Sequence, residues 1–174
     1  MARAALSDAE VEAFRRKTVR AATRLFAAQG YSAVTLRAIA AELGTSPMAP
    51  YRYFDNKAAI FALVRAEAYR RFANEQEAAA AASSDPLERL FRMREAYVKF
   101  ALKHPDEYRV MFELAQEPEE RNPRLARESH RAFEALNDAV KSAIDAGVLE
   151  GDVTTIAHLL WATLHGMVSL HLAG

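Results

Sequence analysis

Residues 35–57 read TLRAIAAELGTSPMAPYRYFDNK and contain two helix-start signals separated by a turn signal. Thr35 is a typical helix N-cap, and we expect a short helix over 36–43, which a glycine ends. Ser46 followed by proline is a second start signal, for a third helix of the N-terminal part that runs to about Tyr53. Two short helices joined by a tight turn have the outline of a helix-turn-helix, although an ordinary helical hairpin has the same outline.

Helical periodicity continues on both sides of this stretch, and no part of the chain alternates apolar and polar residues for long. Upstream, one stripe of apolar and small residues predicts a long first helix that ends near Gly30. Downstream, helices are expected over 57–82, 86–103, 106–115, 123–146 and 152–173. The predicted fold class is all-α. We expect a three-helix domain with a helix-turn-helix over 1–56 and a C-terminal helical bundle over 57–174.

Charge is unevenly distributed along a chain whose formal net charge is zero. Residues 1–60 hold nine Lys/Arg and five Asp/Glu, whereas residues 61–174 hold fourteen and eighteen. This asymmetry indicates a polyanionic partner for the N-terminal third, unless the surface charges cluster by chance. The absence of cysteine excludes disulfides, thiolate catalysis and cysteine-ligated zinc. Residues 1–8 lack an apolar leader, so a cytoplasmic location is expected.

The run from Gly30 to Lys57, with its Tyr-x-x-Phe-x-x-Lys ending, closely resembles the TetR family of repressors over about residues 10–62. Two C-terminal stretches strengthen the resemblance. Residues 161–168 resemble the Trp-x-x-x-His-Gly signature of one TetR subgroup, and residues 104–112 agree with the same subgroup. The resemblance implies a homodimer that binds a palindromic double-stranded operator and releases it when a small molecule fills the C-terminal domain.

The resemblance also assigns roles within the helix-turn-helix. Phosphate contacts fall to a helix-start hydroxyl and a lysine, and two tyrosines pack on the sugar-phosphate backbone. One arginine can reach a base, and four residues that begin the recognition helix lie nearest the groove floor. In chain order the implied DNA-binding residues are Thr35, Arg37, Ser46, Pro47, Met48, Ala49, Tyr51, Tyr53 and Lys57. Pro50 departs from the common pattern, and we expect it to distort the helix start slightly.

The last predicted helix contains no charged residue between Thr154 and Ala173. A helix that is apolar all round is buried on both sides, and in a chain of this size the second cover is expected to be another copy. We therefore predict a homodimer formed through the last two helices. A membrane span is the rival interpretation, but three histidines and three threonines with no flanking basic cluster argue against it.

A ligand cavity is expected inside the C-terminal bundle, and its occupant would be small and largely apolar. The candidates are large apolar residues at helical spacing, with one histidine as a polar anchor, although any of them could simply be core. They are Phe61, Met93, Tyr97, Phe100, Met111, Phe112, Phe133, Trp161 and His165.

Enzyme motifs are missing from the sequence: it contains no Gly-x-Ser-x-Gly, phosphate-binding loop, dinucleotide fingerprint or His-Glu-x-x-His. His158 and His165 lie seven residues apart, but zinc requires three or four converging ligands. No catalytic residue, metal or cofactor is predicted. A ligand-responsive transcriptional repressor is thus expected. The alternative is a helical-bundle small-molecule-binding protein or enzyme without DNA function, which salt-dependent DNA binding would exclude.

Overall fold

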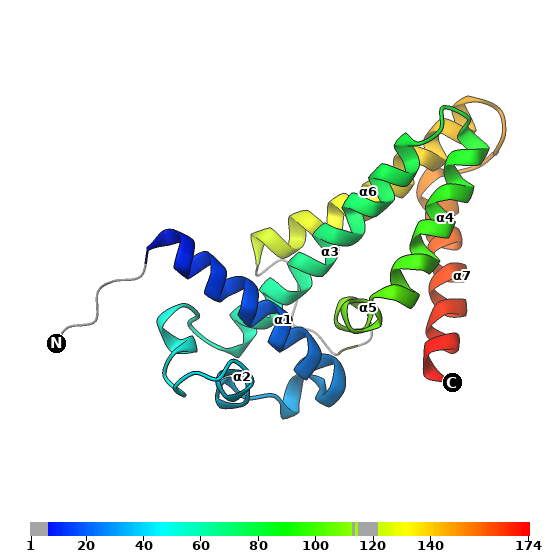
Figure 1. The fold of residues 1–174 in the computed structure, drawn as a ribbon. Coiled ribbons are helices and arrows are strands. Elements are labelled where there is room, and N and C mark those ends of the chain that lie inside the picture. The colour runs from blue at the N-terminus through cyan, green and yellow to red at the C-terminus, as the bar shows by residue number, and fades with distance from the viewer. Residues whose placement is uncertain (1–6, 113, 115–121) are drawn as a thin grey trace.

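The computed structural model describes residues 7–112, 114 and 122–174, and every regular element within these ranges is a helix. Figure 1 shows a head (residues 7–56) at one end of an elongated bundle (residues 57–174). The predicted all-α class is confirmed. In chain order the elements are α1 (Asp8–Ala33), α2 (Leu36–Glu42), the 3-10 turn η1 (Pro50–Arg52), α3 (Lys57–Ala81), α4 (Pro86–Lys103), α5 (Pro105–Phe112), α6 (Pro123–Asp145) and α7 (Val153–Ala173).

Helix α1 begins and breaks where local chemistry dictates. Ser7 is its N-cap: the Ser7 hydroxyl accepts from the Glu10 N–H, and the Glu10 carboxylate accepts from the Ser7 N–H at 2.8 Å. Gly30 interrupts the helix with φ +79°, a left-handed conformation that glycine adopts without a steric penalty. The predicted break near Gly30 is confirmed, and the last three residues of α1 form a separate turn beyond it.

Four of the five bundle helices, α3, α4, α6 and α7, start at Asn or Asp caps. The Asn56 side chain accepts from the Ala59 N–H at 2.8 Å, and the Asp85 carboxylate accepts from the Glu88 N–H at 2.7 Å. Asn122 and Asp152 cap α6 and α7 in the same way. Helix α5 covers Pro105–Phe112, and the predicted end at residue 115 lies outside the described residues.

Helix α3 belongs to both the head and the bundle. At its start Phe61 packs against Phe26 of α1, with ring centroids 4.9 Å apart. Three turns later Phe72 makes edge contacts with Tyr97 and Phe100 of α4, at 5.4 and 5.2 Å. These residues belong to one continuous cluster of buried side chains, so α3 connects the packing of the two parts (Figure 1).

Candidate DNA-binding surface and ligand cavity

Helix α2 presents two of the predicted DNA-binding residues to solvent. Its inward face is held by Ile39 and Ala40, both fully buried in the head. The Thr35 hydroxyl caps the helix by accepting from the Ala38 N–H at 3.1 Å, as predicted. Thr35 and Arg37 are both exposed at the start of the helix. Because the apolar face fixes α2, their side chains are accessible to a partner.

The segment that follows α2 differs from the predicted recognition helix. Gly44 makes the turn with φ +65°, but an α-helix does not form between residues 46 and 53. The Ala49 N–H bonds to the Ser46 carbonyl at 2.9 Å, a tight turn, and only the 3-10 turn η1 follows. Proline at position 50 has no N–H to donate to the Ser46 carbonyl, the bond that an α-helix would need there. The effect of Pro50 is thus larger than the slight distortion expected.

Most predicted DNA-binding residues of this segment lie on the surface of the head. Ser46 and Pro47 are exposed, and Met48 and Tyr51 are 64% and 50% exposed. Ala49 and Tyr53 are half-buried. The Tyr53 ring packs against Phe14 of α1, with centroids 4.7 Å apart, so this tyrosine also holds the segment on the head.

Lys57 is engaged inside the head. Its ammonium donates to the carbonyl oxygens of Tyr31 and Ser32, at 2.8 and 3.3 Å, and lies 4.3 Å from the centre of the Tyr31 ring. These two carbonyls belong to the short turn after Gly30, at the end of α1. Lys57 therefore joins the first turn of α3 to the end of α1.

The bundle contains a cavity of about 610 Å³ between α3, α4, α6 and α7, with an almost entirely apolar lining. This volume is within the usual range for small-molecule sites, about 300–1,000 Å³. Arg94 and His158 are the ionisable side chains at its wall besides the tyrosines. Five of the predicted ligand-binding residues line it: Met93, Tyr97, Phe112, Phe133 and Trp161.

The other four predicted ligand-binding residues lie outside the cavity lining. Phe61 packs in the head, where Tyr31 lies 4.8 Å from it, ring centre to ring centre. Phe100 and Met111 are buried in the shared core. His165 lies behind the cavity wall, where its ring stacks on Trp161 with centroids 5.4 Å apart.

Several lining residues were not predicted. Helix α3 contributes Tyr69, Phe72 and Gln76, while other helices add a set of aliphatic and aromatic side chains. One signal could have found part of this set: Leu90, Met93 and Tyr97 follow one another at three- and four-residue spacing on α4. The additional apolar residues of the lining are Leu87, Leu90, Phe91, Ala132, Leu136, Leu149, Ile156, Leu160, Leu164 and Met167.

A buried polar group lies next to Tyr97 of the cavity wall. The Tyr108 hydroxyl lies 2.7 Å from His165 Nδ1 and 3.2 Å from the Tyr97 hydroxyl. Burial raises the pKa of the Tyr97 hydroxyl far above its usual range, and the hydrogen bond with Tyr108 raises it further. The Tyr97 hydroxyl is thus neutral and contacts Tyr108 and His165, which lie outside the cavity lining.

Helix α7 leaves an apolar stripe uncovered. Its inner face packs Trp161, Leu164 and Val168 against the core. Its outer face exposes Leu159 and Leu170, at 63% and 76%, and Met167, which lines the cavity, is also 57% exposed. By length and composition α7 could cross a membrane, the one described helix of which this is so. Three histidines, three threonines and a serine within the helix make it a poor span.

Metal binding has no support in the described residues, which contain no group of three or more His, Asp or Glu side chains placed to hold an ion.

Comparisons with known families agree with both halves of the chain. Residues 19–64 match the family "Bacterial regulatory proteins, tetR family", and residues 90–174 match the "Tetracyclin repressor-like, C-terminal domain", of the Trp-His-Gly type. No curated protein sequence matches the chain.

Solved structures share the fold over most of the chain. The TetR family transcriptional regulator PfmR from Thermus thermophilus is 26% identical, with TM-score 0.75 over 87% of this chain and 84% of its own. The transcriptional regulator FadR from Bacillus subtilis, solved with stearoyl-CoA, is 20% identical, with TM-score 0.78 over 89% and 85%. The fatty acid degradation regulator FadR from Bacillus halodurans is 19% identical, with TM-score 0.77 over 88% and 81%. The chain is a DNA-binding transcriptional regulator that belongs to the TetR family.

Proposed function

We propose that this regulator is a repressor that binds a palindromic operator as a homodimer and is released by a largely apolar effector. The observation that carries the proposal is the position of α3. Its first turn is bonded to the head through Lys57, and residues 69, 72 and 76 of the same helix line the apolar cavity. A ligand in the cavity therefore contacts the element on which the head is mounted.

The DNA-binding part of the proposal rests on the exposed surface of the head, residues 7–56, and on the first turn of α3. Arg37, Thr35 and Tyr51 are exposed, and in this proposal Arg37 donates to a base edge while Thr35 and Tyr51 donate to phosphates. The residues Ser46, Pro47, Met48 and Ala49 would lie at the groove, with Tyr53 and Lys57 at its edge. Since residues 46–49 are a turn and not a helix, apolar contacts such as Met48 with a thymine methyl would dominate there.

The dimer is supported by the uncovered stripe of α7. Leu159 and Leu170 lie eleven residues apart, about three turns, which places them on one face of the helix, with the exposed Met167 beside that face. Leaving these large apolar side chains in water is costly, at about 25 cal/mol for each Å². A second copy, packed through α6 and α7, would cover the stripe on both protomers by two-fold symmetry and hold two heads at a fixed spacing. The bundle, residues 57–174, would then be the sensing and dimerisation domain.

The effector is proposed to be a long-chain acyl compound. The cavity lining is almost entirely apolar, which suits an alkyl chain, and Arg94 stands at the wall to meet an acidic head group. The related regulator from B. subtilis was solved with stearoyl-CoA.

Release of the operator follows from the thermodynamic linkage between effector binding and operator binding. If the effector binds better to a conformation whose heads are wrongly spaced for the operator, operator affinity falls by the same coupling free energy. The regulator would act in the cytoplasm, where the chromosome lies.

The test uses DNA selected by the purified protein and an in vitro transcription template that carries it. The protein should lower transcription, and stearoyl-CoA should restore it, whereas CoA alone should not. Leu136→Trp fills the cavity and should keep repression but respond at least about tenfold more weakly to stearoyl-CoA. Leu102→Trp, on the exposed side of α4, is the matched control and should respond like the parent. Release of the Leu136→Trp variant at the parent's concentration, or no release of the parent, would contradict the proposal.

A further inference from the structure

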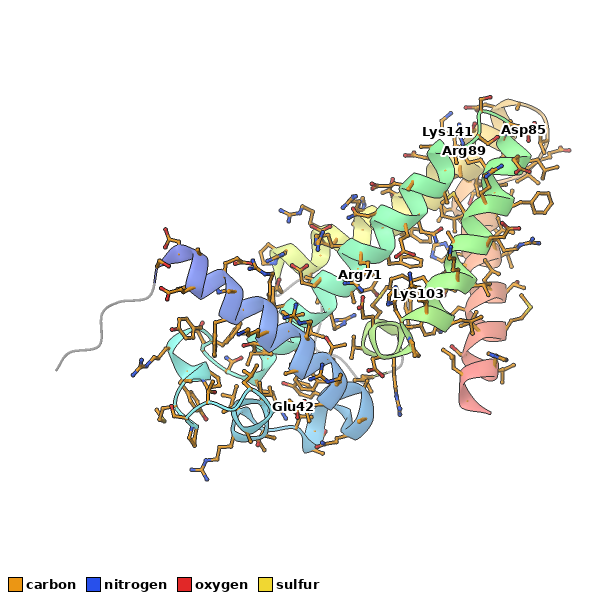
Figure 2. All side chains as sticks on the ribbon, viewed as in Figure 1. Glu42, Arg71, Asp85, Arg89, Lys103 and Lys141 are labelled. Carbon is orange, nitrogen blue, oxygen red and sulfur yellow. The ribbon has the colours of Figure 1, made fainter. Side chains whose placement is uncertain are left out.

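A second concavity, of about 660 Å³, lies on a different side of α3 from the apolar cavity, and the two share no lining residue. We name it the basic groove. It is built where the head meets the bundle, by residues 12–24 of α1, residues 63–71 of α3, the end of α4, the start of α5 and Arg124 of α6. Figure 2 labels two of its cations, Arg71 on α3 and Lys103 at the end of α4.

The basic groove has an excess of positive charge, although the net charge of the chain is zero. Eight Lys and Arg side chains line it, against four Asp and Glu, a formal excess of four, whereas the net charge of the whole chain is zero. The cations are Arg15, Arg16, Arg20, Arg24, Arg70, Arg71, Lys103 and Arg124, and the acids are Glu12, Glu67, Asp106 and Glu107.

The groove cations divide into those with a carboxylate partner and those without one. Arg71 pairs with Glu107 at 2.8 Å, and Arg24 pairs with Glu42 at 2.7 Å. The other paired arginines are Arg16, which contacts Glu12, and Arg70 and Arg124, which both contact Glu67. Within the part of the chain that the structure describes, Arg15, Arg20 and Lys103 form no ion pair. They line the groove from two helices, α1 and α4, and within the described residues none of the four groove acids forms an ion pair with them.

The operator does not account for this surface. None of the residues 35–57 lines the basic groove. The groove residues of α1 include Glu12, Arg16, Val19 and Thr23, at helical spacing, on a different face from Phe14. Phe14 packs against Tyr53 of the predicted DNA-binding segment, so the groove and that segment lie on different faces of α1.

We propose that the basic groove binds a small polyphosphate anion, such as inorganic triphosphate or the phosphoanhydride part of a nucleotide. Guanidinium groups bind phosphate oxygens through two parallel N–H donors, and a lysine adds a mobile point charge. Convergent cations from two helices suit several linked phosphates better than a single one. Because the groove lies at the surface, among exposed arginines, a nucleotide base could remain outside it.

Such an anion would bridge the head and the bundle, because α1 supplies Arg15 and Arg20 while α4 supplies Lys103. Operator affinity and anion affinity would therefore be linked, by a route separate from the apolar cavity. The proposal stands whether or not the cavity takes an acyl effector.

The test is isothermal titration calorimetry of the full chain, without DNA, using sodium tripolyphosphate and orthophosphate at constant ionic strength. Tripolyphosphate should bind one molecule per chain and much more tightly than orthophosphate. Arg20→Gln with Lys103→Gln should weaken it at least about tenfold, as expected for the loss of charge-assisted hydrogen bonds. Arg92→Gln with Lys141→Gln makes the same change of charge outside the groove and should bind like the parent. Arg20→Lys with Lys103→Arg should retain binding within about threefold.

Four results would overturn the proposal. The first is a heat of tripolyphosphate binding that does not saturate. The second is equal tripolyphosphate affinity in the groove variant and the matched control. The third is binding of orthophosphate as tight as that of tripolyphosphate. The fourth is a loss of operator affinity in the groove variant as large as that in Arg37→Ala, which would make the groove part of the DNA-binding surface. If the double variant loses its helical circular dichroism signal, Lys103→Gln alone, a change at an exposed side chain, should show the weakening and refutes the proposal if it does not.

Discussion

The Tyr108 hydroxyl lies 2.7 Å from His165 Nδ1, and this contact joins α5 to α7 across the core. Tyr97, on the wall of the apolar cavity, lies 3.2 Å from the same hydroxyl. Helix α5 also packs against α1 of the head. Tyr97 on the cavity wall thus contacts Tyr108 of α5, and α5 packs against α1 of the head.

Tyr108→Phe tests whether this polar group matters for stability. The side chain is fully buried, so removing its hydroxyl breaks the contact with His165 inside the core and should lower the free energy of unfolding by about 1–3 kcal/mol. Urea unfolding followed by circular dichroism measures the loss. Tyr51→Phe, at an exposed position, should change it by less than about 0.5 kcal/mol. Equal stability of parent and Tyr108→Phe would show that the hydrogen bond contributes nothing.

Lys57→Gln should affect both the head and its affinity for DNA. The variant loses the ammonium that bonds the Tyr31 and Ser32 carbonyls, and because the side chain is partly exposed we expect a loss of about 1 kcal/mol. DNA affinity should also fall, by the same factor for every DNA sequence. Thermal unfolding and fluorescence anisotropy with two unrelated duplexes measure the two effects. A loss of DNA affinity on the operator alone would assign Lys57 to base recognition and contradict the prediction.

Arg37→Ala and Thr35→Ala should separate specificity from positioning. Removing Arg37 should relax sequence preference at one base position, at about 1–3 kcal/mol of discrimination, with little change in folding. Removing the Thr35 hydroxyl costs the α2 cap, about 1 kcal/mol of stability, and weakens binding on every sequence. Competition binding with single-base operator variants measures the difference. The assignments fail if Arg37→Ala keeps the parent's full base preference.

Leu170→Glu should break the dimer. This side chain is 76% exposed on the single chain, so the charge costs little in the folded monomer but much in an apolar interface. Light scattering after size exclusion should show a monomer, and operator affinity should fall at least about a hundredfold. Leu102→Glu, at a 50% exposed position of α4, should remain dimeric. An unchanged mass for Leu170→Glu would place the interface elsewhere.

Helix positions were predictable where a local signal sets them. Thr35, Asn56 and Asp85 each cap a helix through their own side chain, a bond that depends on three or four neighbouring residues. The break at Gly30 is also set locally, because glycine adopts the observed φ of +79° without a steric penalty. Such information is complete in the sequence and needs no tertiary structure.

The recognition segment was not predicted correctly because two local signals conflict there. Ser46 and Pro47 favour a helix start, but Pro50 removes the N–H that the first turn needs. Pro50 is buried, so packing of the head holds the turn in place. The sequence alone does not say which signal prevails.

Cavity residues were only partly predicted because periodicity gives the face of a helix but not the position along it. Phe61 and Phe72 lie about three turns apart on α3 and share a face. The first is in the core of the head, against Phe26, and the second lines the cavity. Tertiary packing makes this distinction, which the spacing of apolar residues cannot express.

The measurement that bears most directly on the head is selection of bound duplexes from a random library by the purified chain, followed by affinity measurements across salt concentrations. We predict an enriched palindrome with half-sites about one helical turn or more apart, and an affinity that falls steeply as salt rises. Absence of an enriched sequence, or an affinity that does not change with salt, would contradict the assignment of residues 35–57 to DNA binding.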